Sequence, residues 1–363
     1  MRRIIIVQNS VKTTLIFRKH YIEKLLEKNQ VYLIAPNDCD ESKMKLETLG
    51  VVIYSLPKLS NKTNLVKYWF LSNLLVIKHR YHGDTFICHF LVTLLIHFLF
   101  IIPFNRRLII YTEGLGSIFS SNRFARGTIK KILHLSSGKR LFCNNEERLL
   151  LGSPNDIVTG GIGVDFNLFP FKKFKPKFLE ANSPLKILYI GRLIEDKGTM
   201  DVICLLRKLL EKGIDVQLTL VGDVYPNNPT SLTLEDIERF KDEFGMMIRF
   251  EGFQKSVVKY YHESDLLVLP SVREGFPVCV MEANSCGLPV IGYDVPGVRD
   301  AIENNINGKL VPLKSIDQLV IEITNMIDDD TMLRLNHQSR IYANNNFDVE
   351  DKSKFLVNLL IGL

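Results

Sequence analysis

Short apolar runs recur along the first half of the chain and alternate with longer segments of helical period. The expected strands are residues 2–8, 30–36, 51–57, 85–90 and 107–113. The segment that follows the first of them, up to Lys28, is expected to be a helix. Short apolar runs that alternate with helices are typical of a parallel sheet covered on both faces.

The same pattern restarts in the second half. The expected strands there are residues 185–191, 216–222, 247–252, 265–271 and 288–294. Between the two sets, "FPFKKFKPKFLEANSPL" (169–185) has neither helical nor strand period and is typical of a linker. We therefore expect an α/β fold of two doubly wound, Rossmann-like domains that face each other across a cleft. Ligands of such sheets bind outside the carboxyl ends of the strands.

The expected domain boundaries follow from this pattern. They are an N-terminal domain over 1–170, a linker over 171–184, a C-terminal domain over 185–345, and a last helix over 346–363 that could cross back to the first domain.

One apolar stretch raises the question of a membrane span. Residues 85–104 contain no Asp, Glu, Lys or Arg, and their number is about what a bilayer crossing needs. However, His89, Thr93 and His97 interrupt the stretch and Pro103 ends it. We interpret it as a strand followed by a largely buried helix, with both histidines packed inside and an outer face that could touch lipid headgroups.

Charge is distributed unevenly along the chain. Residues 1–180 hold 27 Lys and Arg against 13 Asp and Glu, a net charge of +14, and the remainder has a net charge of −8. This asymmetry indicates that the first half meets something anionic, for which lipid and nucleic acid are both candidates. A solvated basic surface is the alternative.

Composition excludes several classes of protein and favours a reducing compartment. With 46% hydrophobic and 24% charged residues, the chain has no collagen, disorder or coiled-coil bias. Its 6 cysteines are scattered without a C-x-x-C pair, which favours free thiols over disulfides or zinc. The apolar run in "MRRIIIVQNS" is too short for a signal peptide.

The stretch "SVREGFPVCVMEANSCGLPV" (271–290) contains a candidate anion site. Pro277 suits the first position of a helix, because its missing N–H would have no partner there. The amides near Val278 and Cys279 would then point outward from the positive end of the helix. Gly275, in the preceding turn, allows close approach of a ligand to the backbone.

Two glutamates flank this helix start. Glu282 lies about a turn into the helix, where an ionised carboxylate suits a vicinal diol such as a ribose. Glu274 lies on the turn, where the other end of a nucleotide-linked group would be. The spacing indicates one carboxylate on each side of a central diphosphate. Alternatively, Glu282 complements the helix dipole and Glu274 is a surface loop residue.

Two cations lie just beyond a predicted strand. "YIGRLIEDKG" (189–198) places Arg192 and Lys197 there, where they could clamp a diphosphate or form a solvated charge pair. The glycine-rich "VTGGIGVDFNLF" (158–169) lacks the G-x-G-x-x-G spacing and is weak support on its own.

These pieces occur in the order of a known family. "GIGVD", "GRLIEDKG", "LVGD", "EGF", "LVLPSVREGFP" with its continuation to "GKLV", and "NNFDVEDKSKFLVNLL" make the second half resemble the nucleotide-sugar half of glycosyltransferase family 4, which has the GT-B architecture. The first half resembles it more loosely. "YTEGLGSIF" (111–119) is similar to a segment of bacterial enzymes that build surface polysaccharides on a lipid carrier.

The resemblance implies roles for individual residues. Glu274 would bind the donor sugar's hydroxyls and support the transition state, Glu282 would bind the ribose, and Arg192 with Lys197 would hold the diphosphate. The remaining implied contacts are Gly275, Phe276 and Pro277 around the sugar, Val278 and Cys279 at the helix start, Gly252 and Phe253 near the base, and Gly116 in the first half.

Two departures from the family concern the first half. "QNSVKTT" follows the first strand without the glycine-rich loop that many members have, so the acceptor side is expected to differ. Glu113 stands where many members have His. It could contact the donor sugar, act as a base toward an acceptor hydroxyl, or cap a helix.

The resemblance implies transfer with retention of the anomeric configuration. Glycosyl transfer passes through an oxocarbenium-like state while negative charge builds on the departing diphosphate. Fixed cations and helix amides can supply several kcal/mol there, so we expect neither a metal nor a cofactor. We interpret "DCD" (38–40) as a turn and "DDD" (328–330) as a solvated loop or helix end.

The sequence and its resemblance to glycosyltransferase family 4 therefore predict a metal-independent hexosyltransferase with a nucleotide-sugar donor. The resemblance alone implies retention and favours a UDP-sugar. The expected acceptor is a glycan on undecaprenyl diphosphate in O-antigen, capsule or exopolysaccharide synthesis, with no nucleic-acid partner. The enzyme would be cytoplasmic and peripheral on the inner face of the bacterial plasma membrane. A nucleotide-sugar epimerase of similar fold and a non-catalytic sugar-nucleotide-binding scaffold are the alternatives.

Membrane docking would use the basic first half, since cations near an anionic leaflet each contribute about 1 kcal/mol. The candidates are Lys12, Arg18, Lys19, Lys67, Arg106, Arg107, Arg123, Arg126, Lys130 and Lys131.

Overall fold

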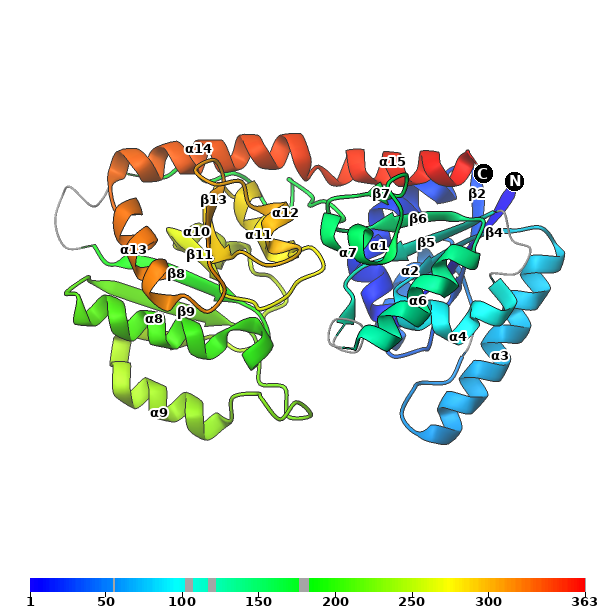
Figure 1. The fold of residues 1–363 in the computed structure, drawn as a ribbon, viewed down its shortest axis with the longest axis horizontal. Coiled ribbons are helices and arrows are strands. Elements are labelled where there is room, and N and C mark those ends of the chain that lie inside the picture. Colours follow the sequence, from blue (N-terminus) through cyan, green and yellow to red (C-terminus); the bar gives the residue numbers. More distant parts are fainter. Residues whose placement is uncertain (55, 102–106, 117–121, 176–182, 363) are drawn as a thin grey trace. The chain divides into compact units, whose positions relative to one another are not determined.

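The chain forms two compact units, each built on a parallel sheet with helices on its faces (Figure 1). The computed structural model describes residues 1–54, 56–101, 107–116, 122–175 and 183–362. Unit 1 comprises Met1–Ile162 and Val349–Leu363, and unit 2 comprises Gly163–Asp348. The two units are described separately below.

Unit 1 contains a parallel sheet whose central strands are buried on both faces. Its strands are β1 (Arg2–Val7), β2 (Asn29–Ile34), β3 (Val52–Ile53), β4 (Thr85–His89), β5 (Leu108–Thr112), β6 (Lys139–Phe142) and β7 (Ile157–Val158). Their order is β3-β2-β1-β4-β5-β6-β7. The chain adds β2 and β3 on one side of β1 and then returns to add β4 on its other side. Ile4, Ile5 and Ile6 are fully buried, which explains why β1 reads as a continuous apolar run.

The helices of unit 1 are α1 (Val11–Leu26), α2 (Asp40–Thr48), α3 (Lys62–Tyr81), α4 (Leu91–Ile101), α6 (Arg123–Leu135), α7 (Asn145–Leu151) and α15 (Val349–Ile361). Helix α15 packs on α1, where Lys24 and Glu350 form an ion pair of 2.6 Å. Asp38 of "DCD" accepts hydrogen bonds from the amides of Val11 and Lys12 at 2.9 and 3.1 Å. Its carboxylate therefore holds the start of α1.

The apolar stretch of residues 85–104 forms the buried strand β4 and then α4, in agreement with the sequence interpretation. His97 is fully buried and hydrogen-bonds Asn73 of α3 at 2.9 Å, and burial lowers the pKa of its imidazole to about 4. Residues 102–104 and Arg106 lie outside the described residues. Within the described part of the chain, no helix has both the length and the apolar character that a membrane span needs.

Unit 2 contains a second parallel sheet. Its strands are β8 (Leu185–Ile190), β9 (Val216–Val221), β10 (Ile248–Phe250), β11 (Leu266–Leu269), β12 (Val290–Tyr293) and β13 (Gly308–Val311), in the order β10-β9-β8-β11-β12-β13. Because β8 lies between β9 and β11, the connections turn back there, and the carboxyl ends of β8 and β11 border the expected ligand crevice.

The helices of unit 2 are η1 (Glu195–Lys197), α8 (Thr199–Glu211), α9 (Leu234–Phe244), η2 (Gly245–Met247), α10 (Val258–Glu263), α11 (Val278–Ser285), α12 (Val298–Ala301), α13 (Ile316–Met326) and α14 (Asp329–Asn346). Helix α11 is anchored by the buried Asn284, whose side chain accepts from Asn307 at 2.7 Å and donates to the Leu288 carbonyl at 3.1 Å. Asp328 of "DDD" caps α14 by accepting from the Thr331 amide at 2.7 Å.

The described part of the expected linker belongs to unit 2 and packs against the rest of that unit. The Lys172 amide donates to the Cys286 carbonyl at 3.0 Å, and the Phe174 amide donates to the Asn336 side chain at 3.1 Å. Residues 163–170, which we had expected in the first domain, also belong to unit 2, and residues 176–182 lie outside the described residues.

Candidate active site

Two loops of unit 2 meet at the carboxyl edge of its sheet. One follows β8 and contains Arg192 and Lys197, and the other follows β11 and contains Glu274. Because β8 and β11 are parallel neighbours, their carboxyl ends lie side by side. The Val272 amide donates to the Asp196 carbonyl at 3.0 Å, and Arg273 forms an ion pair with the Asp196 carboxylate. These contacts tie the two loops together.

Lys197 and Glu274 form an ion pair across the loops. Nζ of Lys197 lies 2.6 Å from Oε1 of Glu274, and the side chains are 22% and 15% exposed. The backbone of Glu274 packs closely against Gly297, whose φ is +79°. A Cβ there would lie 2.5 Å from the Glu274 carbonyl oxygen, so only glycine fits at position 297.

Helix α11 starts beside this ion pair. Pro277 is its N-cap, so the helix begins at Val278, one residue later than the sequence predicted. The first amides of a helix have no intrahelical partner, which leaves those of Val278 and Cys279 as anion donors. Burial raises the pKa of the Cys279 thiol, the carboxylates of Glu274 and Glu282 raise it further, and Lys197 opposes them. These three charged side chains therefore converge around Cys279.

Glu282 lies in α11 and is held by a tyrosine that the sequence analysis missed. The Tyr261 hydroxyl donates to Oε2 of Glu282 at 2.7 Å, which leaves Oε1 for a further donor. Burial raises the pKa of the Glu282 carboxyl to about 7, and the Tyr261 hydrogen bond opposes part of this rise. A tyrosine pair in "KYYHES", just before a buried strand, was the available signal, since a buried tyrosine hydroxyl needs a partner.

Arg192 lies at the same edge, where the backbone segments after β8 and β9 approach each other closely. The exposed Arg192 guanidinium lies 5.2 Å from the ring centroid of Tyr225, a second residue that the sequence analysis missed. The Gly222 amide donates to the Gly252 carbonyl at 2.9 Å. A Cβ at Gly222, whose φ is +146°, would lie 1.8 Å from the Gly191 carbonyl oxygen. Glycine thus lets the ends of β8 and β9 approach each other here.

Two aromatic residues of the predicted site point to different surroundings. The Phe276 ring packs edge-on against Phe347 with centroids 5.9 Å apart. Phe253, next to Gly252, is 66% exposed.

Glu113 lies in unit 1, directly after β5, and has an environment of its own. It forms an ion pair with Arg18 and lies 3.2 Å from Nδ1 of His89, whose Nε2 lies 2.8 Å from the Tyr21 hydroxyl. Burial alone would raise the pKa of the Glu113 carboxyl, but Arg18 and His89 outweigh it and hold the pKa below its ordinary value. Oε1 of Glu113 is buried without a hydrogen-bond partner among the described residues.

The structure thus divides the predicted site residues between the units. Arg192, Lys197, Glu274 and Glu282 lie at one edge of unit 2 together with Gly252, Phe253 and the 275–279 segment, whereas Glu113 and the exposed Gly116 lie in unit 1. One prediction was wrong. Arg18, which we expected on a membrane-facing surface, is 3% exposed because it pairs with Glu113. Glu113 caps no helix among the described residues.

Comparisons with known proteins identify the family that the chain resembles. Residues 170–346 match the family model of glycosyl transferases group 1. The chain is 27% identical over 352 residues to N,N'-diacetylbacillosaminyl-diphospho-undecaprenol alpha-1,3-N-acetylgalactosaminyltransferase of Campylobacter jejuni, with 88% of each chain covered. It is 24% identical over 260 residues to UDP-Gal:alpha-D-GlcNAc-diphosphoundecaprenol alpha-1,3-galactosyltransferase of Escherichia coli, covering 67% of this chain and 66% of that one.

A solved structure extends the likeness to the fold of the entire chain. The crystal structure of HepE from Anabaena in complex with UDP and glucose superimposes with a TM-score of 0.79 at 17% identity, covering 100% of both chains. The predicted α/β class with two doubly wound sheets is therefore confirmed, and the chain has the GT-B fold. The family match and these relatives together identify the chain as a GT-B glycosyltransferase. These relatives favour neither the epimerase nor the scaffold alternative.

The raised pKa of Glu282 predicts a pH dependence of stability. Between the ordinary pKa of 4.5 and about 7, the folded chain holds a proton that the unfolded chain has lost, so the free energy of unfolding falls as pH rises through this window. The effect should be about 1 kcal/mol after allowance for solvent screening. Glu282→Gln cannot ionise at this position. The Tm of this variant minus that of the wild type should therefore be roughly 2–4 °C higher at pH 8 than at pH 5.

Thermal unfolding at both pH values measures this difference. The exposed Glu211→Gln variant serves as the matched control and should follow the wild type. An equal difference between Glu282→Gln and wild type at both pH values would show that the carboxyl is already ionised at pH 5.

Proposed function

We propose that this glycosyltransferase moves a hexosyl residue from a UDP-sugar to a glycan that grows on undecaprenyl diphosphate, in bacterial O-antigen, capsule or exopolysaccharide synthesis. The names of the Campylobacter and Escherichia relatives support the acceptor, because both contain a diphospho-undecaprenol or diphosphoundecaprenol group. UDP-Gal in the second name and UDP in the HepE crystals support the donor.

The observation that carries this proposal is the ion pair of Lys197 and Glu274 beside the start of α11, the helix that also contains Glu282. In the proposed complex the helix amides and Lys197 bind the diphosphate, with Arg192 on its outer side. Glu282 accepts from the ribose hydroxyls through Oε1. Glu274 accepts from the sugar hydroxyls while its ion pair with Lys197 holds it in place.

The same groups account for the proposed chemistry. When the glycosidic bond to the diphosphate breaks, negative charge grows on the leaving oxygen next to fixed cations and helix amides, which stabilise it without reorganisation. We propose on this basis a metal-independent reaction. Retention of the anomeric configuration is proposed from the resemblance to glycosyltransferase family 4. The Oε1 atom of Glu113, which has no hydrogen-bond partner among the described residues, is the proposed contact of unit 1 for a sugar hydroxyl of the acceptor.

Glu274→Ala should lower turnover by about 100-fold or more, because it removes a contact that strengthens in the transition state and releases Lys197. The measurement is UDP release from a UDP-sugar in the presence of a membrane extract as acceptor, with EDTA present. NMR of the product reports the anomeric configuration. Glu235→Ala, an exposed glutamate on α9, is the control and should retain wild-type turnover. Turnover of Glu274→Ala within threefold of the wild type would refute the assigned role.

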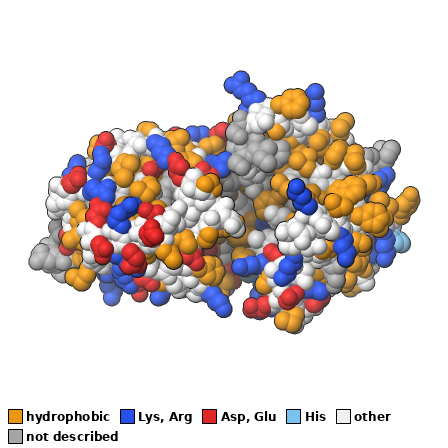
Figure 2. Space-filling view, turned by 90° about the horizontal axis from the view of Figure 1, so that it is seen from below, with side chains coloured by type: hydrophobic (Ala, Val, Ile, Leu, Met, Phe, Trp, Pro, Cys, Tyr) orange, Lys and Arg blue, Asp and Glu red, His pale blue; other side chains and the backbone are white. Residues whose placement is uncertain are grey.

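We also propose that unit 1 binds the inner leaflet as a peripheral membrane domain. Unit 1 holds 25 Lys and Arg against 13 Asp and Glu, a net charge of +12. Hydrophobic side chains gather on the part of unit 1 that contains α3, next to Lys and Arg side chains (Figure 2). The exposed large hydrophobic residues of α3 are Leu65, Val66, Trp69, Phe70, Leu74 and, at its end, Tyr81, which are 42–89% exposed.

This face suits an anionic bilayer. Apolar side chains on one side of a helix can insert at the headgroup boundary, and neighbouring cations bind anionic lipid. Apart from the buried Arg18 and from Arg106, which lies outside the described residues, the basic residues predicted to dock are exposed or half-buried.

Replacing Val66 and Phe70 together by glutamate should reduce binding to anionic vesicles by at least tenfold, because each change removes buried apolar area and adds like charge. Cosedimentation with phosphatidylglycerol vesicles at low and high salt measures binding, which should also weaken with salt. The matched control replaces Ile16 and Leu149 together by glutamate. These two residues are 57% and 72% exposed and lie on other helices of unit 1. Equal binding of the two double variants, or no binding of the wild type at low salt, would contradict this docking surface.

A further inference from the structure

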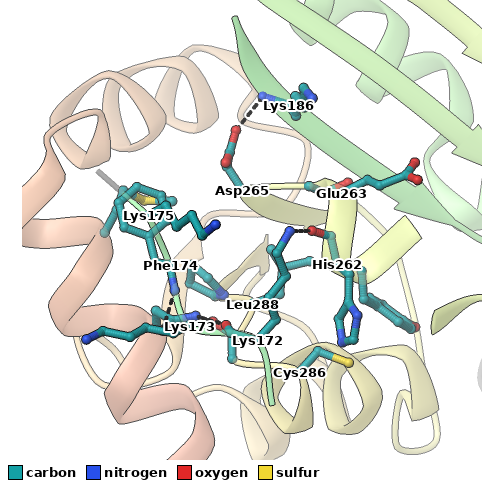
Figure 3. Close-up of a pocket in the computed structure, with 16 residues that line it drawn as sticks. Lys172, Lys173, Phe174, Lys175, Lys186, His262, Glu263, Asp265, Cys286 and Leu288 are labelled. Atoms are coloured by element: carbon teal, nitrogen blue, oxygen red, sulfur yellow. Dashed lines mark hydrogen bonds between the residues drawn. The ribbon is translucent and has the colours of Figure 1, made fainter. Parts of the chain in front are cut away.

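A cavity of about 180 Å³ lies at the amino edge of the sheet of unit 2 (Figure 3). Lys186 is the second residue of β8, Asp265 directly precedes β11 and Pro289 directly precedes β12. Lys197 and Glu274 follow the opposite ends of β8 and β11. Strands of this length span roughly 13–20 Å at about 3.3 Å per residue, so the cavity is separate from the sugar-nucleotide site.

The cavity is positively charged, although the unit around it is not. Lys172, Lys173, Lys175 and Lys186 line it, against the acidic Glu263 and Asp265. Unit 2 as a whole holds 21 Lys and Arg and 27 Asp and Glu, a net charge of −6. Positive charge is therefore concentrated at this cavity, although unit 2 as a whole carries a negative net charge.

Among the residues that the structure describes, none of these four lysines forms an ion pair, and Lys172 donates instead to the His262 carbonyl oxygen. The Asp265 carboxylate accepts from the Lys186 backbone amide at 2.8 Å. In Figure 3 the side chain of Lys175 reaches toward that of Lys172, whereas that of Lys173 points the other way. Like charges that converge in this way favour an anion between them.

The wall that carries Lys172 and Lys175 is held in place. The Asn336 side chain donates to the Lys172 and Gly287 carbonyls at 3.0 and 2.8 Å, and accepts from the Phe174 amide at 3.1 Å. The cations thus lie on a backbone that is already ordered, which lowers the cost of binding. The uncharged part of the lining includes the apolar side chains of Phe174, Leu288, Pro289 and Met332.

We propose that this cavity is a second anion site, which binds a phosphate-bearing ligand independently of the sugar nucleotide. The phosphoryl oxygens accept from the ammonium groups of Lys172, Lys175 and Lys186, and an organic substituent packs on the apolar lining. Lysine ammonium groups bind phosphate as point charges. A soluble phosphate compound and a phospholipid headgroup present the same phosphoryl group, and the two arms of the experiment distinguish them.

The first arm is calorimetric titration of the whole chain with inorganic diphosphate. The variant Arg192→Ala with Lys197→Ala, which removes the cations proposed for the donor, should still bind. Lys175→Glu with Lys186→Glu should weaken this remaining binding by about tenfold or more, since two charged hydrogen bonds to the phosphoryl oxygens are lost and two like charges are added. Lys212→Glu with Lys241→Glu makes the same change in net charge at exposed positions of unit 2 and should bind like the wild type.

The second arm is flotation with phosphatidic acid vesicles, compared between the same two glutamate pairs. Weaker diphosphate binding of the cavity variant identifies a soluble ligand, and weaker binding only to vesicles identifies a lipid headgroup. The lysines changed to glutamate, Lys175, Lys186, Lys212 and Lys241, are all exposed, so these variants should fold. The unfolding midpoints of all variants verify this. If the cavity variant and its control bind equally in both arms, the proposal is wrong. Because the donor cations are absent in the first arm, failure there does not affect the proposed function.

Discussion

The ion pair between Lys197 and Glu274 is the contact on which the site of unit 2 depends. It joins two loops that follow neighbouring parallel strands, β8 and β11, so the topology of the sheet brings together side chains 77 residues apart. The pair lies at the start of α11, where helix amides and two cations offer positive charge and two glutamates offer acceptors. An anion flanked by hydroxyl-bearing groups matches this arrangement, which is the chemistry of a sugar nucleotide.

Much of the fold followed from periodicity, and the exceptions have physical reasons. Strands such as β1 and β8 are buried on both faces and read as continuous apolar runs. The pattern missed β6, whose sequence "KRLF" begins with two charged residues, β7, which has two residues, and β13, which begins with glycine. The predicted strand 51–57 is reduced to Val52–Ile53 at the edge of its sheet.

The candidate site was predictable where its residues lie in contiguous motifs, and not where partners come from afar. Glu274 and Glu282 share one loop and helix, whereas the partner of Glu282, Tyr261, lies 21 residues earlier. Arg18 seemed a surface cation in a basic helix, because nothing local shows that Glu113, 95 residues on, neutralises it in the interior. The roles proposed for Glu113 and for the basic surface are therefore inferred from the structure of unit 1 and not from a sequence motif.

The most direct test of this account is a crystal structure of the chain with a UDP-sugar. The account predicts the diphosphate within hydrogen-bond distance of the Val278 or Cys279 amide and in contact with Lys197 and Arg192, with the ribose hydroxyls on Glu282 and the sugar next to Glu274. A diphosphate bound elsewhere in unit 2, out of reach of Lys197 and the start of α11, would contradict the central claim.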